Sequence, residues 1–251
     1  MKVIYLLFML FLVATCLYSQ SPYEMYADRP DVTQSPYCVV KGRLQIETGL
    51  LLTNDTGLEV MDIANTLFRY GLTKSMEFRA GAGFRRETIT VSGNDQTYDG
   101  LANVSVGIKV RVFQHIRKFP DAGIILSGIL PVGEDRFSPD RVEPKAILAL
   151  AHKLNRRLSM GYNFGGYWPN GRYLNLLASA SLGIWIAGPF SAFVEGYAES
   201  PHGTPTNILL DAGIIISFAK NFQLDASVGG AINEEAPDRT INVGFAWRLP
   251  R

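Results

Sequence analysis

Apolar and polar residues alternate along most of the chain from Gly42 onward. In residues 101–113, Val104, Val106 and Ile108 lie on one side of an extended chain, and small or polar residues lie on the other. A period of two predicts β-strands with one apolar and one polar face. We expect about twelve such strands, within a range of roughly 10–14. They cover residues 42–52, 64–72, 75–84, 101–113, 122–130, 145–154, 158–167, 173–186, 190–199, 207–218, 222–229 and 240–249.

The connections between these strands fall into two classes. Longer segments, such as residues 53–63, 86–100 and 131–144, alternate along the chain with tight turns. The tight turns lie at residues 73–74, 155–157, 187–189 and 219–221. Long loops at one end and short turns at the other are typical of outer-membrane β-barrels. An even number of strands then places both chain ends on the periplasmic side.

The apolar faces indicate which side of the barrel meets lipid. They run for five to seven residues without a charge, whereas the polar faces hold Gly, Ser and Asn with few charges. A soluble β fold is the alternative, and it would carry Lys and Glu on its outside. Aromatic residues gather beside the tight turns, as in the interfacial girdle of membrane barrels. They are Phe68, Tyr70, Phe190, Phe218, Phe222, Phe245 and Trp247. The sequence therefore predicts an all-β fold, a transmembrane antiparallel β-barrel.

Composition supports this fold and limits the partners. The 251 residues are 47% hydrophobic and 19% charged, and the formal net charge is +1. So many apolar residues exclude a disordered chain, and the balanced charge disfavours nucleic acid as a partner. We expect outer-membrane lipid, the barrel-assembly machinery and small-molecule solutes as partners. The oligomeric state stays open.

The N-terminus predicts export. Lys2 precedes an apolar run over residues 3–17, which is too short for a transmembrane helix and matches a cleaved signal peptide. We expect cleavage after Ser19, and processing as a lipoprotein at Cys16 is the alternative. The chain then divides into a signal peptide (1–19), a periplasmic N-terminal lead-in segment (20–41) and an outer-membrane β-barrel (42–251).

Charged residues on the polar faces are the candidates for the lumen and the solute pathway. They are Arg43, Glu47, Glu77, Arg79, Lys109, Arg111, Glu195, Glu199, Asp211, Asp225 and Arg248. Because a charge removed from water needs a partner, paired charges that rigidify a narrow interior are one interpretation. A polar constriction that selects solutes is the other. Twelve strands lie between the filled 8-stranded barrels and the open 16–18-stranded porins, which favours a narrow channel.

Catalytic chemistry has few candidates. Among the three histidines, His115 and His152 fall in a turn and a strand, and His202 falls in an external loop close to Ser200. A Ser–His pair on the outer surface is the arrangement that a hydrolase would need. A histidine in a polar loop is usually solvated, so we expect that the protein is not an enzyme. We also expect no cofactor and no metal site.

The segment before the first strand carries the most distinctive motif. Asp28, Arg29, Pro30 and Asp31 follow one another, and Pro36 comes soon after. Each proline disfavours helix in the residue that precedes it. An extended periplasmic lead-in that closes the end of the barrel is one account of this segment. A short plug or partner-docking segment is the other.

The same motif carries a resemblance to a known family. Asp28-Arg29-Pro30-Asp31, followed by a Ser-Pro pair and by a Gly before the Gln45-Ile46-Glu47 strand, resembles the opening of the MetA-pathway-of-phenol-degradation family of outer-membrane β-barrel proteins. Similar pieces recur over most of residues 27–249. The resemblance implies an outer-membrane channel or facilitator for passive uptake or efflux of small solutes, apolar or aromatic ones among them. A structural or surface-interaction barrel without transport is the alternative.

Overall fold

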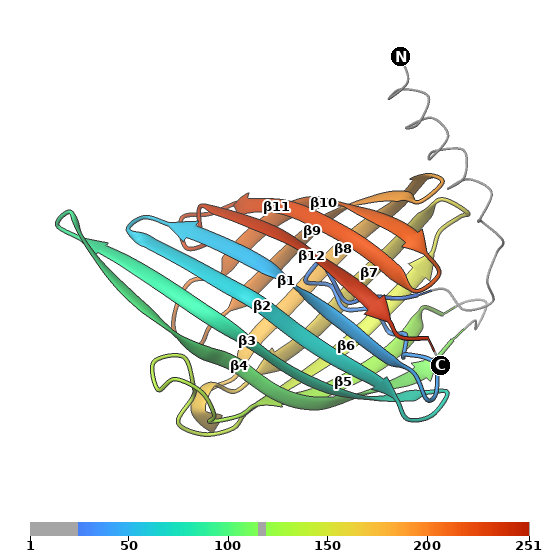
Figure 1. Cartoon of the computed structure of the whole chain (residues 1–251), viewed down its shortest axis with the longest axis horizontal. Helices are drawn as coiled ribbons and strands as arrows, with labels where there is room; N and C mark the ends of the chain where they lie inside the picture. The colour runs from blue at the N-terminus through green and yellow to red at the C-terminus, as the bar shows by residue number, and fades with distance from the viewer. Residues whose placement is uncertain (1–24, 115–118, 251) are drawn as a thin grey trace, which may run out of the picture.

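The chain folds into a closed barrel of twelve antiparallel strands (Figure 1). The computed structural model describes residues 25–114 and 119–250, so the predicted signal peptide, Cys16 and His115 lie outside the described residues. No helix in these two ranges is long and apolar enough to cross a membrane. The strands are β1 (Leu44–Asp55), β2 (Leu58–Gly71), β3 (Met76–Val91), β4 (Asn94–Phe113), β5 (Asp121–Ile129), β6 (Glu143–Lys153), β7 (Leu158–Tyr167), β8 (Asn175–Ala187), β9 (Phe190–Ser200), β10 (Asn207–Ala219), β11 (Phe222–Ala231) and β12 (Arg239–Arg248).

Each strand pairs with the next along the chain, and β12 closes the barrel against β1. In that closing pair Gln45 lies opposite Arg248, and Asn54 lies opposite Arg239. The start of β1 and the end of β12 therefore share one rim, as an even strand number requires. A closed barrel leaves no unpaired strand edge, which is the condition for crossing a bilayer with strands.

The two faces of the barrel wall differ as the alternation predicts. Large apolar side chains such as Ile214 (52% exposed) and Leu126 (48% exposed) cover the outside, while the buried side chains of the wall are mostly polar. The exposed aromatic residues include Phe68, Tyr70 and Phe218 beside the tight turns. A soluble barrel would have the reverse arrangement, so the predicted membrane-spanning fold is confirmed.

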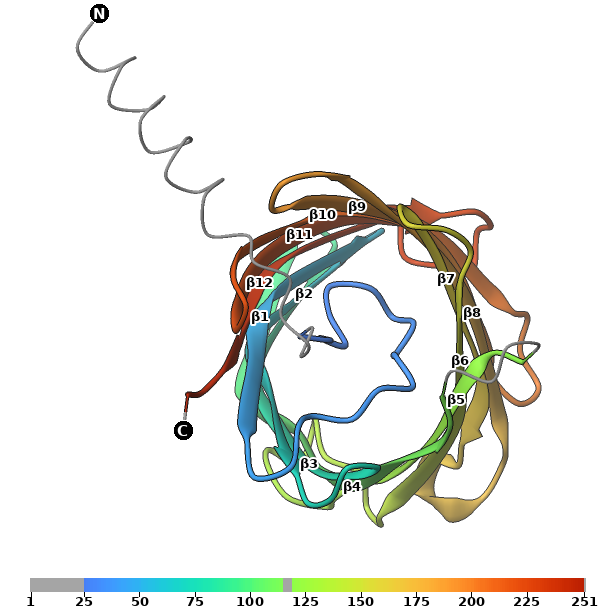
Figure 2. The ribbon, with the colours of Figure 1, turned by 90° about the vertical axis from the view of Figure 1, so that its right-hand side faces the viewer.

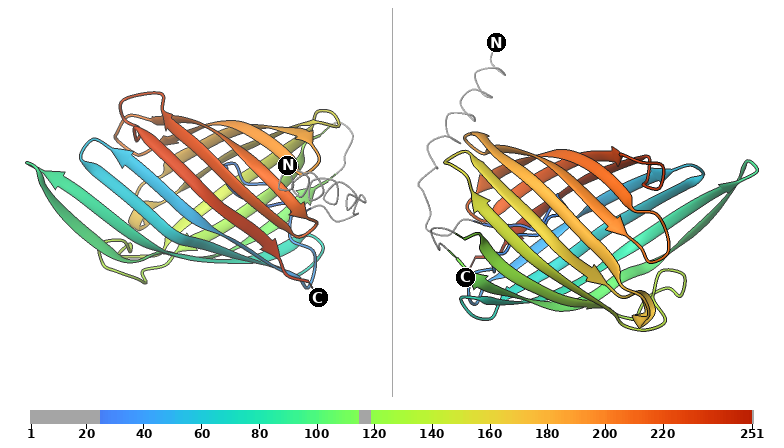
Figure 3. Two further views of the ribbon diagram at one scale, coloured as in Figure 1. Left: turned by 45° about the horizontal axis from the view of Figure 1, so that its top comes forward. Right: turned by 180° about the vertical axis from the view of Figure 1, so that it is seen from behind.

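Two of the predicted long loops are wrong, because strands occupy most of them. β3 and β4 continue through residues 86–100 to a two-residue turn at Ser92 and Gly93, both with positive φ. Two-residue turns of this kind match the twist of the flanking strands. Residues 53–63 likewise form a hairpin, and the β3–β4 hairpin projects beyond the rest of the barrel (Figure 3). A strand that extends beyond the bilayer needs no apolar face towards lipid. The alternation of apolar and polar residues therefore ends before the strands end.

Bulges explain a further difference at the start of β2. The sequence predicts a strand from Ala64, whereas β2 begins at Leu58. Ala64 has φ 49°, and the pairing with β3 shifts between Ile63 and Thr66. A bulge changes the parity of the residues that follow it. The period-two pattern therefore breaks at Ala64, although the strand continues.

Candidate functional site

Residues 26–39, which we call the lumen segment, lie inside the barrel. Figure 2 shows this part of the chain, in blue, looping across the space that the strands enclose. Most of its residues are buried or half-buried there, with Thr33 only 6% and Val39 only 4% exposed, while Val32 is 50% exposed. Of the two accounts that the sequence leaves open, the contacts described below are those of a plug.

Arg69 of β2 lies at the centre of the contacts on one side of the lumen. Its side chain is fully buried, with Nε 2.8 Å from a Glu77 oxygen and Nη1 2.7 Å from a Glu47 oxygen. The same guanidinium donates hydrogen bonds to the carbonyl oxygens of Tyr26 and Tyr37 at 3.0 and 2.9 Å. One side chain of the wall therefore holds both ends of the lumen segment. A planar guanidinium with five N–H donors suits this divided role.

Asp28 ties the lumen segment to the same wall through charge. Its Oδ2 lies 2.6 Å from Arg79 Nη1 and 2.7 Å from Lys109 Nζ. Ser35 steadies the carboxylate, since its backbone N and its hydroxyl both donate to Asp28 Oδ1. Burial alone would raise the pKa of Asp28, but the neighbouring Arg69, Lys109 and Arg79 outweigh it and hold this pKa well below its usual range. Asp28 is therefore ionised throughout the neutral pH range.

The charges on this side balance only when the lumen segment is in place. The wall contributes three cations, Arg69, Arg79 and Lys109, and two carboxylates, Glu47 and Glu77. Asp28 adds the third negative charge. Because a buried charge without a partner is strongly destabilising, this arrangement favours the docked lumen segment.

Arg29 makes a second anchor on β11 and β12. Its guanidinium lies 3.0 Å from Asp225 Oδ1 and donates a 2.9 Å hydrogen bond to Asn242 Oδ1. The guanidinium packs against the inner face of the wall at Gly49 of β1 and Gly244 of β12, which are cross-strand partners. A Cβ atom at either glycine would collide with the guanidinium. The two glycines thus leave the space that Arg29 occupies.

Replacement of Gly244 by Ala tests this second anchor. We expect the added methyl group to displace Arg29, because the nearest guanidinium atoms cannot move away while they remain on Asp225. Without this anchor, the backbone amide hydrogens of residues 31–35 should exchange faster with deuterium in the folded barrel, as measured by hydrogen exchange and mass spectrometry. Gly196→Ala is the matched control, since its Cβ would meet nothing closer than 3.9 Å. Equal exchange rates in the two variants would contradict the anchor.

Backbone groups of the lumen segment bind the opposite wall. The N–H groups of Val32 and Thr33 donate to the Glu195 carboxylate at 2.6 and 2.7 Å. Gln34 and Asn163 exchange two hydrogen bonds, at 2.7 and 2.9 Å. The segment is therefore held on both sides, by ion pairs on β2–β4 and by hydrogen bonds on β7–β9.

The structure sorts the predicted lumen charges into three groups. Those that contact the lumen segment or its ion cluster are Glu47, Glu77, Arg79, Lys109, Glu195 and Asp225. Arg43, Arg111 and Arg248 lie at the rim that holds the tight turns and donate to carbonyl oxygens there. Glu199 accepts a hydrogen bond from Tyr167, and Asp211 lies opposite Glu195.

Some lumen residues are missing from the predicted set. Arg69 is fully buried at the centre of the cluster, and its position in the alternation already places it on the polar face. Asn163 and Asn242 bind the lumen segment through their side-chain amides. The candidates were chosen by their charge, so the uncharged amide side chains of Asn163 and Asn242 were not among them.

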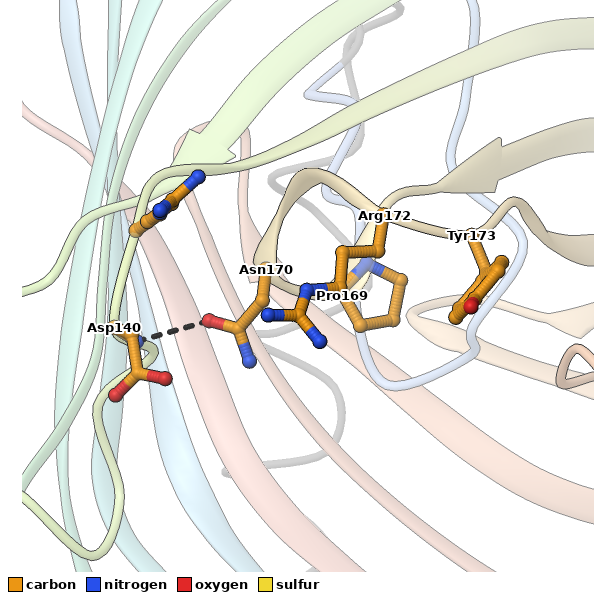
Figure 4. Close-up of a pocket in the computed structure, with 6 residues that line it drawn as sticks. Asp140, Pro169, Asn170, Arg172 and Tyr173 are labelled. Carbon is orange, nitrogen blue, oxygen red and sulfur yellow. Dashed lines mark hydrogen bonds between the residues drawn. The ribbon is translucent and has the colours of Figure 1, made fainter.

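A cavity lies at the rim opposite the tight turns, and Figure 4 shows the residues that line it. It has a volume of about 300 Å³ and lies between the loop after β5 and the short 3-10 helix η1 (Pro169–Gly171). Asn170 closes one side, because its Oδ1 accepts a 3.0 Å hydrogen bond from Asp140 N. Arg141 and Arg172 also line this cavity. The Asp140–Asn170 contact fixes the loop after β5 against η1 at this rim.

The residues of the hydrolase alternative do not come together. The His202 ring stacks on Tyr173, with ring centroids 4.5 Å apart and an interplanar angle of 7°. Ser200 Oγ instead accepts a 3.1 Å hydrogen bond from Thr206 Oγ1. His152 contacts the Tyr162 hydroxyl at 3.2 Å on the outer face of the barrel. None of these contacts forms a Ser–His pair.

The apolar exterior and the filled polar lumen define a transmembrane β-barrel of the outer-membrane type with an internal N-terminal plug. The chain belongs to the family described as "Putative MetA-pathway of phenol degradation", whose model matches residues 27–249. The resemblance seen in the Asp28–Asp31 motif is thereby confirmed. No curated protein sequence matches the chain.

Solved structures of the same architecture are outer-membrane channels and porins. An outer membrane channel from Pseudomonas putida F1 is similar with a TM-score of 0.65 and 10% sequence identity, over 88% of this chain and 99% of the channel. The KdgM porin (TM-score 0.53, 12% identity) and the NanC porin (TM-score 0.53, 8% identity) each align with 82% of this chain and with 99% and 100% of their own lengths. At these identities the similarity concerns the fold.

Proposed function

We propose that the protein is a passive outer-membrane channel or facilitator for small solutes, apolar or aromatic ones among them. The observation that carries this proposal is the internal position of the lumen segment. A purely structural barrel can fill its interior with side chains, whereas this barrel is wide enough to accept a separate stretch of chain held by reversible ion pairs and hydrogen bonds. Such a segment narrows a pathway and sets its size limit.

Two further points support the proposal. The similar solved structures bear the names of channels and porins. The family description refers to phenol degradation, which favours small aromatic solutes. The Tyr26 and Tyr37 rings of the lumen segment lie with centroids 4.1 Å apart, so this segment offers an aromatic surface to such solutes.

The channel proposal is tested with purified protein in planar lipid bilayers and in liposomes. We expect a small, steady conductance in potassium chloride and liposome swelling with small polyols that declines steeply as the polyol grows. Phenol should reduce the conductance reversibly, and a polyol of the same size should not. A barrel that folds and inserts but passes neither ions nor polyols, with and without its lumen segment, would overturn the proposal.

A further inference from the structure

Two carboxylates of the lumen wall face each other directly across a pair of strands. Glu195 of β9 is the cross-strand partner of Asp211 of β10, and the two are 1% and 8% exposed. Like charges in directly opposite positions repel each other and destabilise a strand pair. Their burial strengthens the repulsion, since less water screens the charges. The wall therefore carries a concentrated negative charge at this point.

The lumen segment adds a third carboxylate to the same place. Asp31 lies close enough to interact electrostatically with Glu195 and Asp211, and Ser181 of β8 donates a hydrogen bond to it. Ser181 is itself the cross-strand partner of Glu195. Three acidic side chains, one from the lumen segment and two from the wall, thus lie within electrostatic reach of one another. We call them the acidic triad.

No cation of the described residues forms an ion pair with the acidic triad. The ion pairs of the lumen connect Asp28, Glu47, Glu77 and Asp225 to arginines and a lysine, and they involve none of the triad. Lys145 of β6 interacts with Glu199, which lies further along β9. The basic side of the lumen is therefore neutralised within the protein, and the acidic side is not.

The hydrogen bonds within the triad are unequal. Glu195 accepts from the backbone N–H groups of Val32 and Thr33 and from the Thr33 hydroxyl. The Oδ1 atom of Asp211 is buried and has no hydrogen-bond partner. A buried carboxylate oxygen without a donor is destabilising, and more so when the carboxylate is charged. Asp211 is thus an acceptor that a ligand with N–H donors would satisfy.

We propose that the acidic triad is a binding site for the ammonium group of a cationic solute, completed by the docked lumen segment. An ammonium group brings one positive charge and three N–H donors, which suit three carboxylates that surround it. No group of three or more His, Cys, Asp or Glu side chains that could hold a metal ion occurs in residues 25–114 and 119–250. Tyr197 interacts with Glu195 and Asp211 and offers a ring for cation–π contact.

Protons compete with the cation for this site. Burial raises the pKa of Asp31 well above its usual range, and the charge of Glu195 raises it further. The side chains that interact with Asp31 are Glu195, Ser181 and Asp211, and Tyr197 and Glu199 lie near the two wall carboxylates. A cation binds most strongly to the ionised triad, so its affinity should rise as the pH rises and protons leave. This site deepens the proposed function, on which its role in transport rests.

The test is a binding titration of the purified barrel in detergent, with benzylammonium as the probe and benzyl alcohol as its neutral counterpart. We expect benzylammonium to bind more tightly than benzyl alcohol at neutral pH, and this preference to weaken towards about pH 5. Asp211→Asn should reduce the affinity for benzylammonium about tenfold or more. Asp62→Asn is the control, because Asp62 of β2 pairs with Arg85 of β3, outside the acidic triad.

A second measurement separates binding from folding. Asp211→Asn removes the repulsion from Glu195, so the empty variant should unfold at a higher urea concentration than the wild type. Equal affinity for both probes, or an unchanged affinity in Asp211→Asn, would overturn the site. A pH-independent affinity would do the same, since the triad must lose protons to bind. Binding without ion or polyol flux would contradict only the channel proposal, and flux without binding would contradict only this site.

Discussion

Arg69→Ala is expected to lower the free energy of unfolding by about 3–5 kcal/mol, the effect of removing one partner from a buried ion cluster. The substitution leaves Glu47 and Glu77 buried without their guanidinium, and it removes the donors to Tyr26 and Tyr37. Urea titration of the detergent-solubilised barrel, followed by the shift in its heat-modifiable gel migration, measures this loss.

Arg85→Ala is the matched control for that substitution. Arg85 is also an arginine of the lumen wall and makes two 2.8 Å hydrogen bonds to Asp62, but its side chain is 30% exposed. Water screens the Arg85 guanidinium in part, and its removal leaves one carboxylate without a partner instead of two, so the loss of stability should be smaller than for Arg69→Ala. If Arg69→Ala and Arg85→Ala shift the unfolding midpoint equally, the ion cluster around Arg69 does not contribute specially to the stability of the barrel.

A compensating substitution adds a stricter check. Glu77→Gln in the Arg69→Ala background removes one of the stranded carboxylates, so it should recover part of the lost stability. In the wild-type background the same change breaks the pair with Arg69 and should destabilise the barrel. Opposite signs in the two backgrounds are the signature of a coupled buried pair.

The barrel was predictable from the sequence because its cause is local. Lipid requires an apolar side chain at every second position of a spanning strand, and segments such as residues 101–113 show this alternation. Where the wall extends beyond the bilayer, the alternation no longer predicts strands. The tip of the β3–β4 hairpin, with its Ser92-Gly93 turn, is held by backbone hydrogen bonds that no side-chain alternation marks.

The plug was only half predictable, for a different reason. Pro30 and Pro36 indicate an extended chain, and extended chain fits a lead-in outside the barrel as well as a plug inside it. The decision depends on partners that are remote in sequence. Asp28 meets Lys109, and Thr33 meets Glu195, across separations of 81 and 162 residues. A charge on a strand shows which face it occupies, but it does not show which residue neutralises it.

Deletion of residues 26–39 is expected to raise the single-channel conductance severalfold and to enlarge the polyols that pass. The segment occupies the space inside the barrel (Figure 2), and its removal replaces protein with water. The three cations on β2–β4 would then lack Asp28, so the open lumen should also become more anion-selective than the wild type. Conductance and reversal potential in planar bilayers measure both effects. Asp28→Asn should show the same change in selectivity in a weaker form.

The reverse experiment fixes the lumen segment in place. Thr33 Oγ1 lies 2.7 Å from Ser179 Oγ of β8, so cysteines at these two positions have their sulfur atoms within reach of a disulfide. With Cys38 replaced by Ser, no other cysteine remains in residues 20–251. The oxidised variant should keep the low conductance without fluctuations to higher levels, and a reducing agent should restore wild-type behaviour.

These two variants together decide whether the lumen segment controls the pathway. A plug that limits flux predicts high conductance after deletion and low, steady conductance after cross-linking, with the wild type between them or near the locked value. The Gln34–Asn163 hydrogen bonds and the Asp28 ion pairs hold the segment without any covalent bond, so thermal release is possible. If deletion leaves conductance unchanged in a barrel of normal heat-modifiable migration, the solute path avoids the lumen segment and the proposed control is wrong.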